Sequence, residues 1–228
     1  FHEFDSSHDD LVNISVKNHF HGLHNEVAHI RKAVSFEKAK NGFMVADPLT
    51  LYDCCPTSDG ASCVILAADH VVKQFTDDPV WVKSSAAASD YLALHDRPSI
   101  TQLAATQKAA RQAYDMAGIA PKDIDLAEVH DCFTIAELLA TEDLGFTERG
   151  TGGVFARENR GRLNEGTTCI NPSGGLKSKG HPLGATGTGQ TVEIFKQLRS
   201  EVEPTRQVRD ADTALSPHVC GSGATWSI

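Results

Sequence analysis

The sequence predicts an α/β fold in which helices cover a mixed sheet. From residue 61 onward, short apolar segments typical of strands alternate with longer segments that show helical periodicity. Clusters of glycine and proline separate these segments, as expected at turns. The 228 residues are 40% hydrophobic and 22% charged, which is ordinary for a globular protein with an ample core.

The first sixty residues are expected to be helical and rich in loops. Asp9 and Asp10 precede an apolar-periodic run, as at a helix start. Residues 41–60 are irregular, because Pro48, Pro56 and a closing Asp-Gly pair are turn signals. The chain starts without Met and without a signal peptide, so we expect the N-terminal part of a longer protein to be absent.

Two strands and one helix are expected in the next sixty residues. Ser99 and Gln102 form a capping-box pattern that opens the helix, and Gly118 closes it. The expected strands are 61–68 and 80–89, and the expected helix is 101–117.

The rest of the chain continues the alternation. Gly145 stops the helix that follows the next strand, and the polar, glycine-rich residues 147–166 predict a surface excursion. The expected strands are 124–130 and 167–171, the expected helices are 133–144 and 185–200, and 214–220 with 224–228 are expected as a closing antiparallel pair.

Charge and cysteine content exclude several classes of protein. The net charge of −9 argues against nucleic acid or an anionic membrane as the main partner. The longest apolar runs are far too short to span a bilayer. Six cysteines without CxxC spacing predict reduced thiols in an intracellular protein. We expect no metal site, because the clustered histidines lack zinc-helix spacing and fit surface or loop positions better; they are His19, His21, His24 and His29.

Reactive side chains follow three of the expected strands. Residues 130–132 (His-Asp-Cys) lie where a strand turns into a helix, and His181 lies in a glycine-rich loop before another helix. His218 and Cys220 precede a glycine turn. Strand ends beside helix N-termini are where sites form in α/β sheets, and a thiol or imidazole placed there can have its pKa tuned.

Each of these features alone has a plain structural explanation. A lone cysteine near a strand end is usually a small core residue, and a lone histidine is usually just hydrogen-bonded. The glycine-rich loop matches neither the P-loop nor the Rossmann pattern. The three places together are much more specific than any one of them.

The three motifs together resemble those of the thiolases, the enzymes that make or cleave 3-oxoacyl-CoA. "GGLKSKGHPLGATG" resembles their GHP motif, and "EVHDCF" resembles the HDCF form of the sterol-carrier-protein type. "DCCPTSDGAS" and "HVCGSGATWSI" resemble a strand entry and the closing turn of the family. The resemblance implies the C-terminal portion of a five-layered αβαβα sandwich. Residues 1–60 would belong to the CoA-binding loop domain and its connection, and residues 61–228 to the C-terminal half.

The resemblance also implies roles for individual residues. His181 would be the base that activates a nucleophilic cysteine, and His130 would help to hold the enolate oxygen. Cys132 would be the second acid/base, with Cys220 as the competing candidate. The implied contacts of the thioester and CoA are Gly221, Gly180, Cys55 and Ser173.

The resemblance implies a coenzyme A thioester as the substrate and no resident cofactor. The expected assembly is a homodimer or homotetramer, with a small acyl-CoA-binding OB-fold protein as a further partner. The expected location is the cytoplasm, or the peroxisome in a eukaryote.

The family's nucleophilic cysteine is missing from this chain. None of the six cysteines has the small-residue, helix-opening context of that nucleophile, so we expect the chain alone to be inactive. A non-catalytic acyl-CoA-binding or scaffold subunit is one alternative, although a scaffold has no need of His130, Cys132 and His181 at strand ends. A C–C lyase (aldolase) on CoA thioesters, which works without a cysteine nucleophile, is the other.

Overall fold

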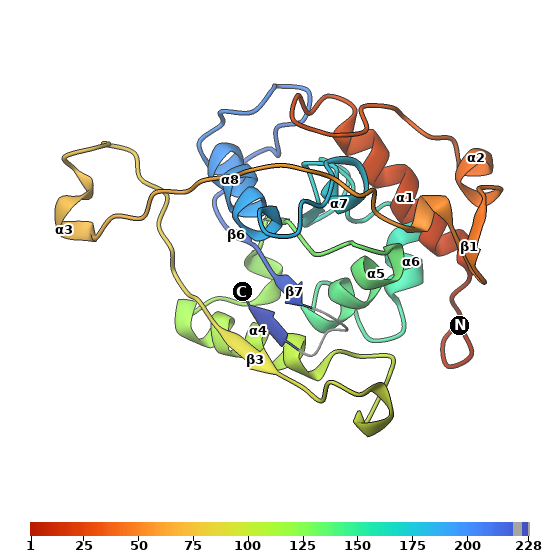
Figure 1. Ribbon diagram of the computed structural model, residues 1–228. Helices are drawn as coiled ribbons and strands as arrows, with labels where there is room; N and C mark the ends of the chain where they lie inside the picture. Colours follow the sequence, from red (N-terminus) through yellow and green to blue (C-terminus); the bar gives the residue numbers. More distant parts are fainter. Residues whose placement is uncertain (221–224, 228) are drawn as a thin grey trace.

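A computed structural model describes residues 1–220 and 225–227 (Figure 1). The α-helices are α1 (His8–Gly22), α2 (Phe36–Lys40), α3 (Asp69–Val72), α4 (Ala104–Ala117), α5 (Thr134–Asp143), α6 (Gly152–Arg157), α7 (Gly175–Ser178) and α8 (Thr186–Leu198). The strands are β1 (Met44–Ala46), β2 (Leu49–Thr50), β3 (Ala87–Ser89), β4 (Leu126–Ala127), β5 (Cys169–Ile170), β6 (Ala214–Leu215), β7 (His218–Cys220) and β8 (Thr225–Ser227). Short 3₁₀ turns are η1 (Leu51–Asp53), η2 (Leu94–Asp96) and η3 (Pro121–Asp123).

Two three-stranded sheets confirm the predicted α/β class. The first has the order β5-β4-β6 and is parallel, with Leu126 of β4 opposite Cys169 and Ala214. The second has the order β3-β8-β7 and is antiparallel. Only Ser216 and Pro217 separate β6 from β7, so the chain passes directly from the parallel to the antiparallel sheet.

The parallel sheet aligns the three reactive segments. Strand β4 leads into residues 128–133, and β5 leads into the glycine-rich loop at 171–187. Strand β6 leads to His218. Because parallel strands end at the same edge of a sheet, these three segments emerge side by side.

The main core lies where α4 and α5 meet the sheets. On α4, alanines spaced four residues apart face inward at Ala105, Ala109 and Ala113, and the helix packs against β3 and β8. The small side chains leave room for the larger ones, such as Ile170 of β5. The Tyr114 hydroxyl donates a hydrogen bond to the Leu144 carbonyl at 2.9 Å, which ties α4 to the end of α5.

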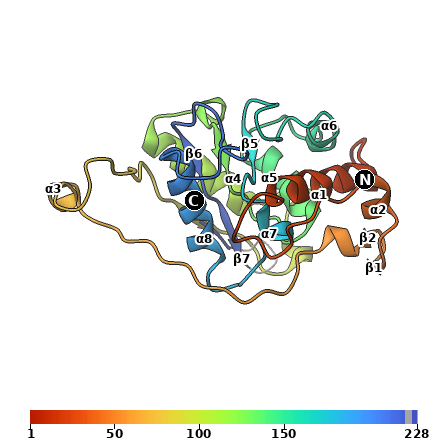
Figure 2. The ribbon, with the colours of Figure 1, turned by 90° about the horizontal axis from the view of Figure 1, so that it is seen from above.

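Helix α1 joins the first sixty residues to the rest of the protein. It begins as the sequence predicts, where the Ser7 amide donates to the Asp10 carboxylate at 2.8 Å. It packs against α2, α5, α6 and α7 (Figure 2). The division of the chain at residue 60 stays a prediction. No helix among the residues described is long and apolar enough to cross a membrane.

The prediction of a strand at residues 61–68 is wrong. These residues are irregular, and Ile65 and Leu66 are 90% and 79% exposed. They belong to an excursion that carries α3 away from the rest of the protein in both views (Figures 1 and 2). An apolar run becomes a strand only beside another strand, and this run pairs with none among residues 1–220 and 225–227. The strand expected at 80–89 shortens to β3 for the same reason.

The start of α4 also differs from the expectation. The helix begins at Ala104, and the Asp143 carboxylate accepts a hydrogen bond from the Leu103 amide at 2.8 Å. The Ser99 hydroxyl instead contacts Thr101 at 3.1 Å. Gly118 ends the helix in the left-handed region at φ 69°, as predicted. A carboxylate from a distant helix therefore replaces the local cap.

Two further expectations are corrected in the second half. Residues 147–166 are more than a surface excursion, because they contain α6 and bury Phe155 in the core. The expected strand 214–220 divides at Pro217, so β6 joins the parallel sheet and only β7 pairs with β8.

Candidate active site

Three imidazole rings meet at the carboxyl edge of the parallel sheet. His130 follows β4, His181 ends the glycine-rich turn, and His218 begins β7. The ring centroids of His130 and His181 are 5.0 Å apart, and those of His130 and His218 are 4.9 Å apart, both edge to face. The structure therefore brings together His130 and His181, which the sequence analysis placed at one site, and adds His218. Within the described ranges, no group of three His, Cys, Asp or Glu side chains is arranged to hold a metal ion.

Burial keeps these imidazoles neutral. His130 is 6% exposed, and loss of solvent, followed by the charges of His218 and His181, lowers its pKa to about 3. Burial and the charges of His218 and Lys179 lower the pKa of His181, and burial lowers that of His218. A neutral imidazole has a free lone pair, so the ring can accept a proton at neutral pH.

The hydrogen bonds of His181 define which of its nitrogens is basic. Its Nδ1 lies 2.7 Å from Thr186 Oγ1, and the Thr186 hydroxyl donates its only proton to the Pro182 carbonyl at 3.0 Å. In this arrangement, Thr186 Oγ1 is free to accept the proton of His181 Nδ1. This leaves the lone pair on Nε2, which makes Nε2 the basic atom.

His130 and His218 each keep one ring nitrogen free. Neither Nδ1 atom has a hydrogen-bond partner among the residues that the structure describes, although both atoms are buried. Buried polar atoms in proteins are nearly always paired. Two such atoms beside His181 can bond to an oxygen of a substrate.

Cys132 is connected to His181 through residues 54–58. The Cys55 amide donates to the Cys132 carbonyl at 2.9 Å, and Thr57 forms a parallel bridge with His181. The Ser58 hydroxyl accepts from the His181 amide at 3.3 Å. Burial, followed by the charges of Asp131 and Cys55, raises the pKa of Cys132 to about 11. At neutral pH this thiol keeps its proton and can donate it.

A buried network of charges holds the loop that carries these residues. Lys17 Nζ lies 2.9 Å from Glu137 Oε1, and the Asn18 amide donates to both Glu137 and Asp131, at 2.7 and 2.8 Å. Asp131 in turn accepts from the Leu176 amide at 2.7 Å. Burial and the charge of Glu137 raise the pKa of Asp131. Because Asp131 lies between His130 and Cys132, the network fixes both beside the glycine-rich loop.

Two glycines allow the close approach of this loop. A Cβ on Gly175, at φ 60°, would lie 2.3 Å from an Asp131 carboxylate oxygen. A Cβ on Gly180, at φ 109°, would lie 2.7 Å from the Ser58 hydroxyl. Both positions combine a backbone conformation that favours glycine with no room for a side chain.

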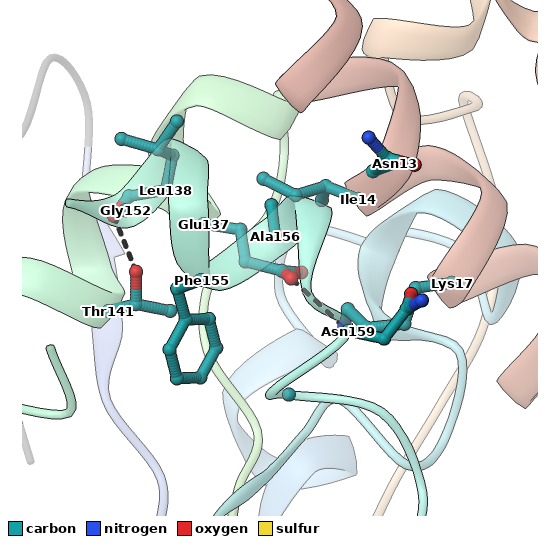
Figure 3. Close-up of a pocket in the computed structure, with 11 residues that line it drawn as sticks. Asn13, Ile14, Lys17, Glu137, Leu138, Thr141, Gly152, Phe155, Ala156 and Asn159 are labelled. Carbon is teal, nitrogen blue, oxygen red and sulfur yellow. Dashed lines mark hydrogen bonds and ion pairs between the residues drawn. The ribbon is translucent and has the colours of Figure 1, made fainter. Parts of the chain in front are cut away.

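A cleft next to His181 is large enough for part of a substrate. Its volume is about 450 Å³, and it is lined by residues 58–62 and 182–185. A second cavity of about 10 Å³ has room for about one water molecule. Its lining includes Lys17, Glu137 and Asn159 and contains no histidine (Figure 3).

Several residues have other positions than expected. Ser173 is 0% exposed, and its amide and hydroxyl both bond to the Glu128 carboxylate, at 2.9 and 2.6 Å, so it supports the loop; its contact with CoA stays a prediction. Gly180 is buried against Ser58. His19 and His21 are buried rather than on the surface. Gly221 and the side chain of Cys220 lie outside the described residues.

The sequence analysis left three contributors out of the assigned site. His218 stands at a strand end in "HVCGSG", which was the available signal. Thr186 lies within the GHP segment, at the start of α8, but nothing local shows that it pairs with His181. Lys17 lies among polar and apolar residues of α1, and nothing local shows that it is buried against Glu137.

The charge of a protonated His218 should contribute, after burial, to the lowered pKa of His181. Replacing His218 by Gln keeps a polar side chain of similar size and removes the charge, so the pKa of His181 should rise towards its usual value of about 6.5. NMR titration of the imidazole protons measures this change. His29→Gln is the control, because His29 bonds to Ser58 at the same loop. An unchanged pKa of His181 in His218→Gln would contradict the charge coupling.

Comparisons with known proteins support one family. Residues 86–228 match the family model described as thiolase C-terminal domain-like. The chain is 47% identical over 227 residues to an acetyl-CoA acetyltransferase of Methanothermobacter thermautotrophicus, which covers all of this chain and 59% of that protein. It is 38% identical over 219 residues to sterol carrier protein 2 of Oryctolagus cuniculus, which covers 94% of this chain and 40% of that protein.

Solved structures show the same fold. The Ltp2-ChsH2(DUF35) aldolase aligns with a TM-score of 0.86 at 22% identity, over 99% of this chain and 59% of that chain. A monomeric SCP2-thiolase-like protein of Mycobacterium smegmatis aligns with a TM-score of 0.70 at 16% identity, over 95% of this chain and 44% of that chain. The chain thus spans less than two thirds of the length of these relatives. With a family model that matches most of its length, the chain belongs to the thiolase family, as a thiolase C-terminal domain-like protein.

Proposed function

We propose that this chain forms the C-terminal part of an acyl-CoA C-acyltransferase, a thiolase that condenses acyl-CoA or cleaves 3-oxoacyl-CoA. The observation that carries the proposal is the edge-to-face contact of His130 with His181, whose ring centroids are 5.0 Å apart. Sequence identities of 47% and 41% to two acetyl-CoA acetyltransferases, each over the whole of this chain, support it. The substrate would be a coenzyme A thioester.

His181 would activate the nucleophile. Its Nε2 accepts the proton of a cysteine thiol that a segment outside this chain contributes, and the thiolate then attacks the thioester carbonyl. The bond from Nδ1 to Thr186 keeps the ring in the required tautomer. The cleft lined by residues 58–62 and 182–185 would receive part of the thioester substrate.

His130 and Cys132 would handle the second half of the reaction. The ring of His130 donates a hydrogen bond to the enolate oxygen, which stabilises the charge that develops there. The Cys132 thiol keeps its proton at neutral pH and can deliver it to the α-carbon during cleavage. In condensation, a Cys132 that has first lost its proton would act as the thiolate base that takes the proton from the α-carbon. Cys220 remains the competing candidate for this step.

A C–C lyase is the second candidate. The observation that favours it is the alignment of 99% of the chain with the fold of an aldolase, together with the lack of a matching nucleophile among the six cysteines. A lyase would use His130 and His218 to hold the enolate oxygen without an acyl-enzyme. A non-catalytic acyl-CoA-binding subunit would need none of these groups.

The proposed assembly follows the same reasoning. We expect a homodimer or homotetramer, with an OB-fold acyl-CoA-binding protein as a further partner. The exposed apolar side chains of the excursion around α3 provide surface for such contacts, including Ile65, Leu66 and Phe75.

Thiolysis of acetoacetyl-CoA tests the proposal. The purified chain alone should show no turnover and form no acetyl adduct. A chimera in which this chain replaces the matching 59% of the Methanothermobacter acetyl-CoA acetyltransferase should cleave the substrate. The parent enzyme is the positive control, and circular dichroism establishes that the chimera is folded. A folded chimera without turnover would contradict the thiolase assignment, and retro-aldol cleavage by it would support the lyase.

A further inference from the structure

The two cysteine-bearing segments near the site pair like strands of a sheet. Cys54 forms an antiparallel bridge with Phe133, and the Cys55 amide donates to the Cys132 carbonyl at 2.9 Å. In an antiparallel register, the residue after Cys54 stands opposite the residue before Phe133. Cys55 and Cys132 are therefore direct cross-strand neighbours.

This pairing places the two thiols within reach of a disulfide. Residues of a hydrogen-bonded antiparallel pair have Cα atoms about 5.5 Å apart and side chains on the same face. Disulfides usually need a Cα separation of about 4.4–6.8 Å. Both cysteines are free and only partly buried, so a small reagent can reach them. The charge of a Cys55 thiolate also contributes to the raised pKa of Cys132, as expected when two sulfur atoms lie close together.

Cys54 is not an equivalent partner. Its backbone is extended, at φ −102° and ψ 142°, so its side chain and that of Cys55 point to opposite faces. Its thiol instead contacts the Thr50 carbonyl at 3.5 Å. The geometry thus distinguishes two cysteines that are adjacent in the sequence.

We propose that Cys55 and Cys132 form an intrachain disulfide when a small disulfide oxidant, such as oxidised glutathione, is present. The Cys55 thiolate attacks one glutathione sulfur, and the first glutathione leaves as a thiolate. The Cys132 thiolate then attacks the Cys55 sulfur, and the second glutathione leaves. The two protein thiols lose two electrons to glutathione, and their two protons end on the glutathione thiolates.

The bond would change the site in two ways. It would fix residues 54–57 to the loop that carries His130 and Cys132. It would also remove the Cys132 thiol as an acid, a consequence that rests on the proposed function. The disulfide itself does not depend on that function.

Peptide mass mapping tests the disulfide without any activity. The purified, dilute chain is equilibrated with oxidised glutathione, alkylated and digested without reduction. We expect a loss of two thiols per chain and a linked peptide pair that contains residues 54–55 and 132, which dithiothreitol separates. Cys54→Ser is the matched control and should keep the link, whereas Cys55→Ser should lose it.

An unfolded control separates native geometry from random pairing. In urea, the same oxidation should give mixed pairs, because the register no longer holds the two thiols together. A link that persists in Cys55→Ser and disappears in Cys54→Ser would overturn the proposal. So would a folded chain in which Cys132 stays a free thiol or a glutathione adduct. Absence of thiolysis by the chimera would leave the mapping result unaffected, so failures of the two proposals are distinguishable.

Discussion

Replacing His181 by Ala should lower the thiolysis rate of the chimeric enzyme by about 10²–10⁴-fold, the usual range for the loss of a general base. The reason is the fixed position of Nε2. The bond from Nδ1 to Thr186 and the bond from the His181 amide to Ser58 hold the ring beside His130. Without the ring, the nucleophilic thiol keeps its proton at neutral pH.

Two control variants show whether this loss concerns the base itself. His29→Ala also removes an imidazole that contacts Ser58, but His29 is exposed, so this variant should leave the rate within a few-fold. Thr186→Val keeps His181 and removes the hydrogen bond that fixes its tautomer, so the rate should fall by less than in His181→Ala. Steady-state kinetics with acetoacetyl-CoA measure all three. A decrease in rate of less than tenfold in His181→Ala would contradict the assignment of His181 as the base.

Replacing Lys17 by Met should lower the free energy of unfolding by about 3–5 kcal/mol, the usual cost of removing one partner of a buried ion pair. Lys17 is the cation 2.9 Å from Glu137, and its ammonium also donates to the Ile170 carbonyl at 2.8 Å. Its loss leaves the buried Glu137 carboxylate without its ion-pair partner. Chemical denaturation of the chain measures the change.

The surface offers a matched control for Lys17. Lys40 and Asp9 are 2.8 Å apart, but both side chains are largely in water. Because solvent screens an exposed ion pair, Lys40→Met should change stability far less than Lys17→Met. Equal effects of the two substitutions would mean that the network under the site contributes no more than a surface pair.

Much of the fold could be predicted because local patterns and tertiary contacts agree. The apolar segments at β4 and β5 are bounded by turns and are buried by the helices that follow them. Gly118 ends α4 by a purely local rule. The strand expected at 61–68 failed because strand formation depends on a neighbour that the sequence of the segment does not specify.

The candidate site, like the fold, could be predicted only in part. Histidines at strand ends could be recognised, because parallel strands bring their ends together whatever the details of packing. The bond between Ser173 and Glu128 could not be predicted, since the two residues are 45 positions apart in the sequence. The link between Thr186 and His181 depends on the path of the loop between them, which the spacing alone does not give.

Trapping the acetyl-enzyme in the chimera tests the central claim most directly, namely that the edge with His130, Cys132 and His181 performs thiolase chemistry. Mass spectrometry of the Cys132→Ala chimera with acetyl-CoA should show an acetylated enzyme that forms no acetoacetyl-CoA, because the acyl transfer needs His181 and the carbon–carbon step needs Cys132. Cys220→Ala should acetylate and also turn over. A fully active Cys132→Ala beside a stalled, acetylated Cys220→Ala would contradict the assignment.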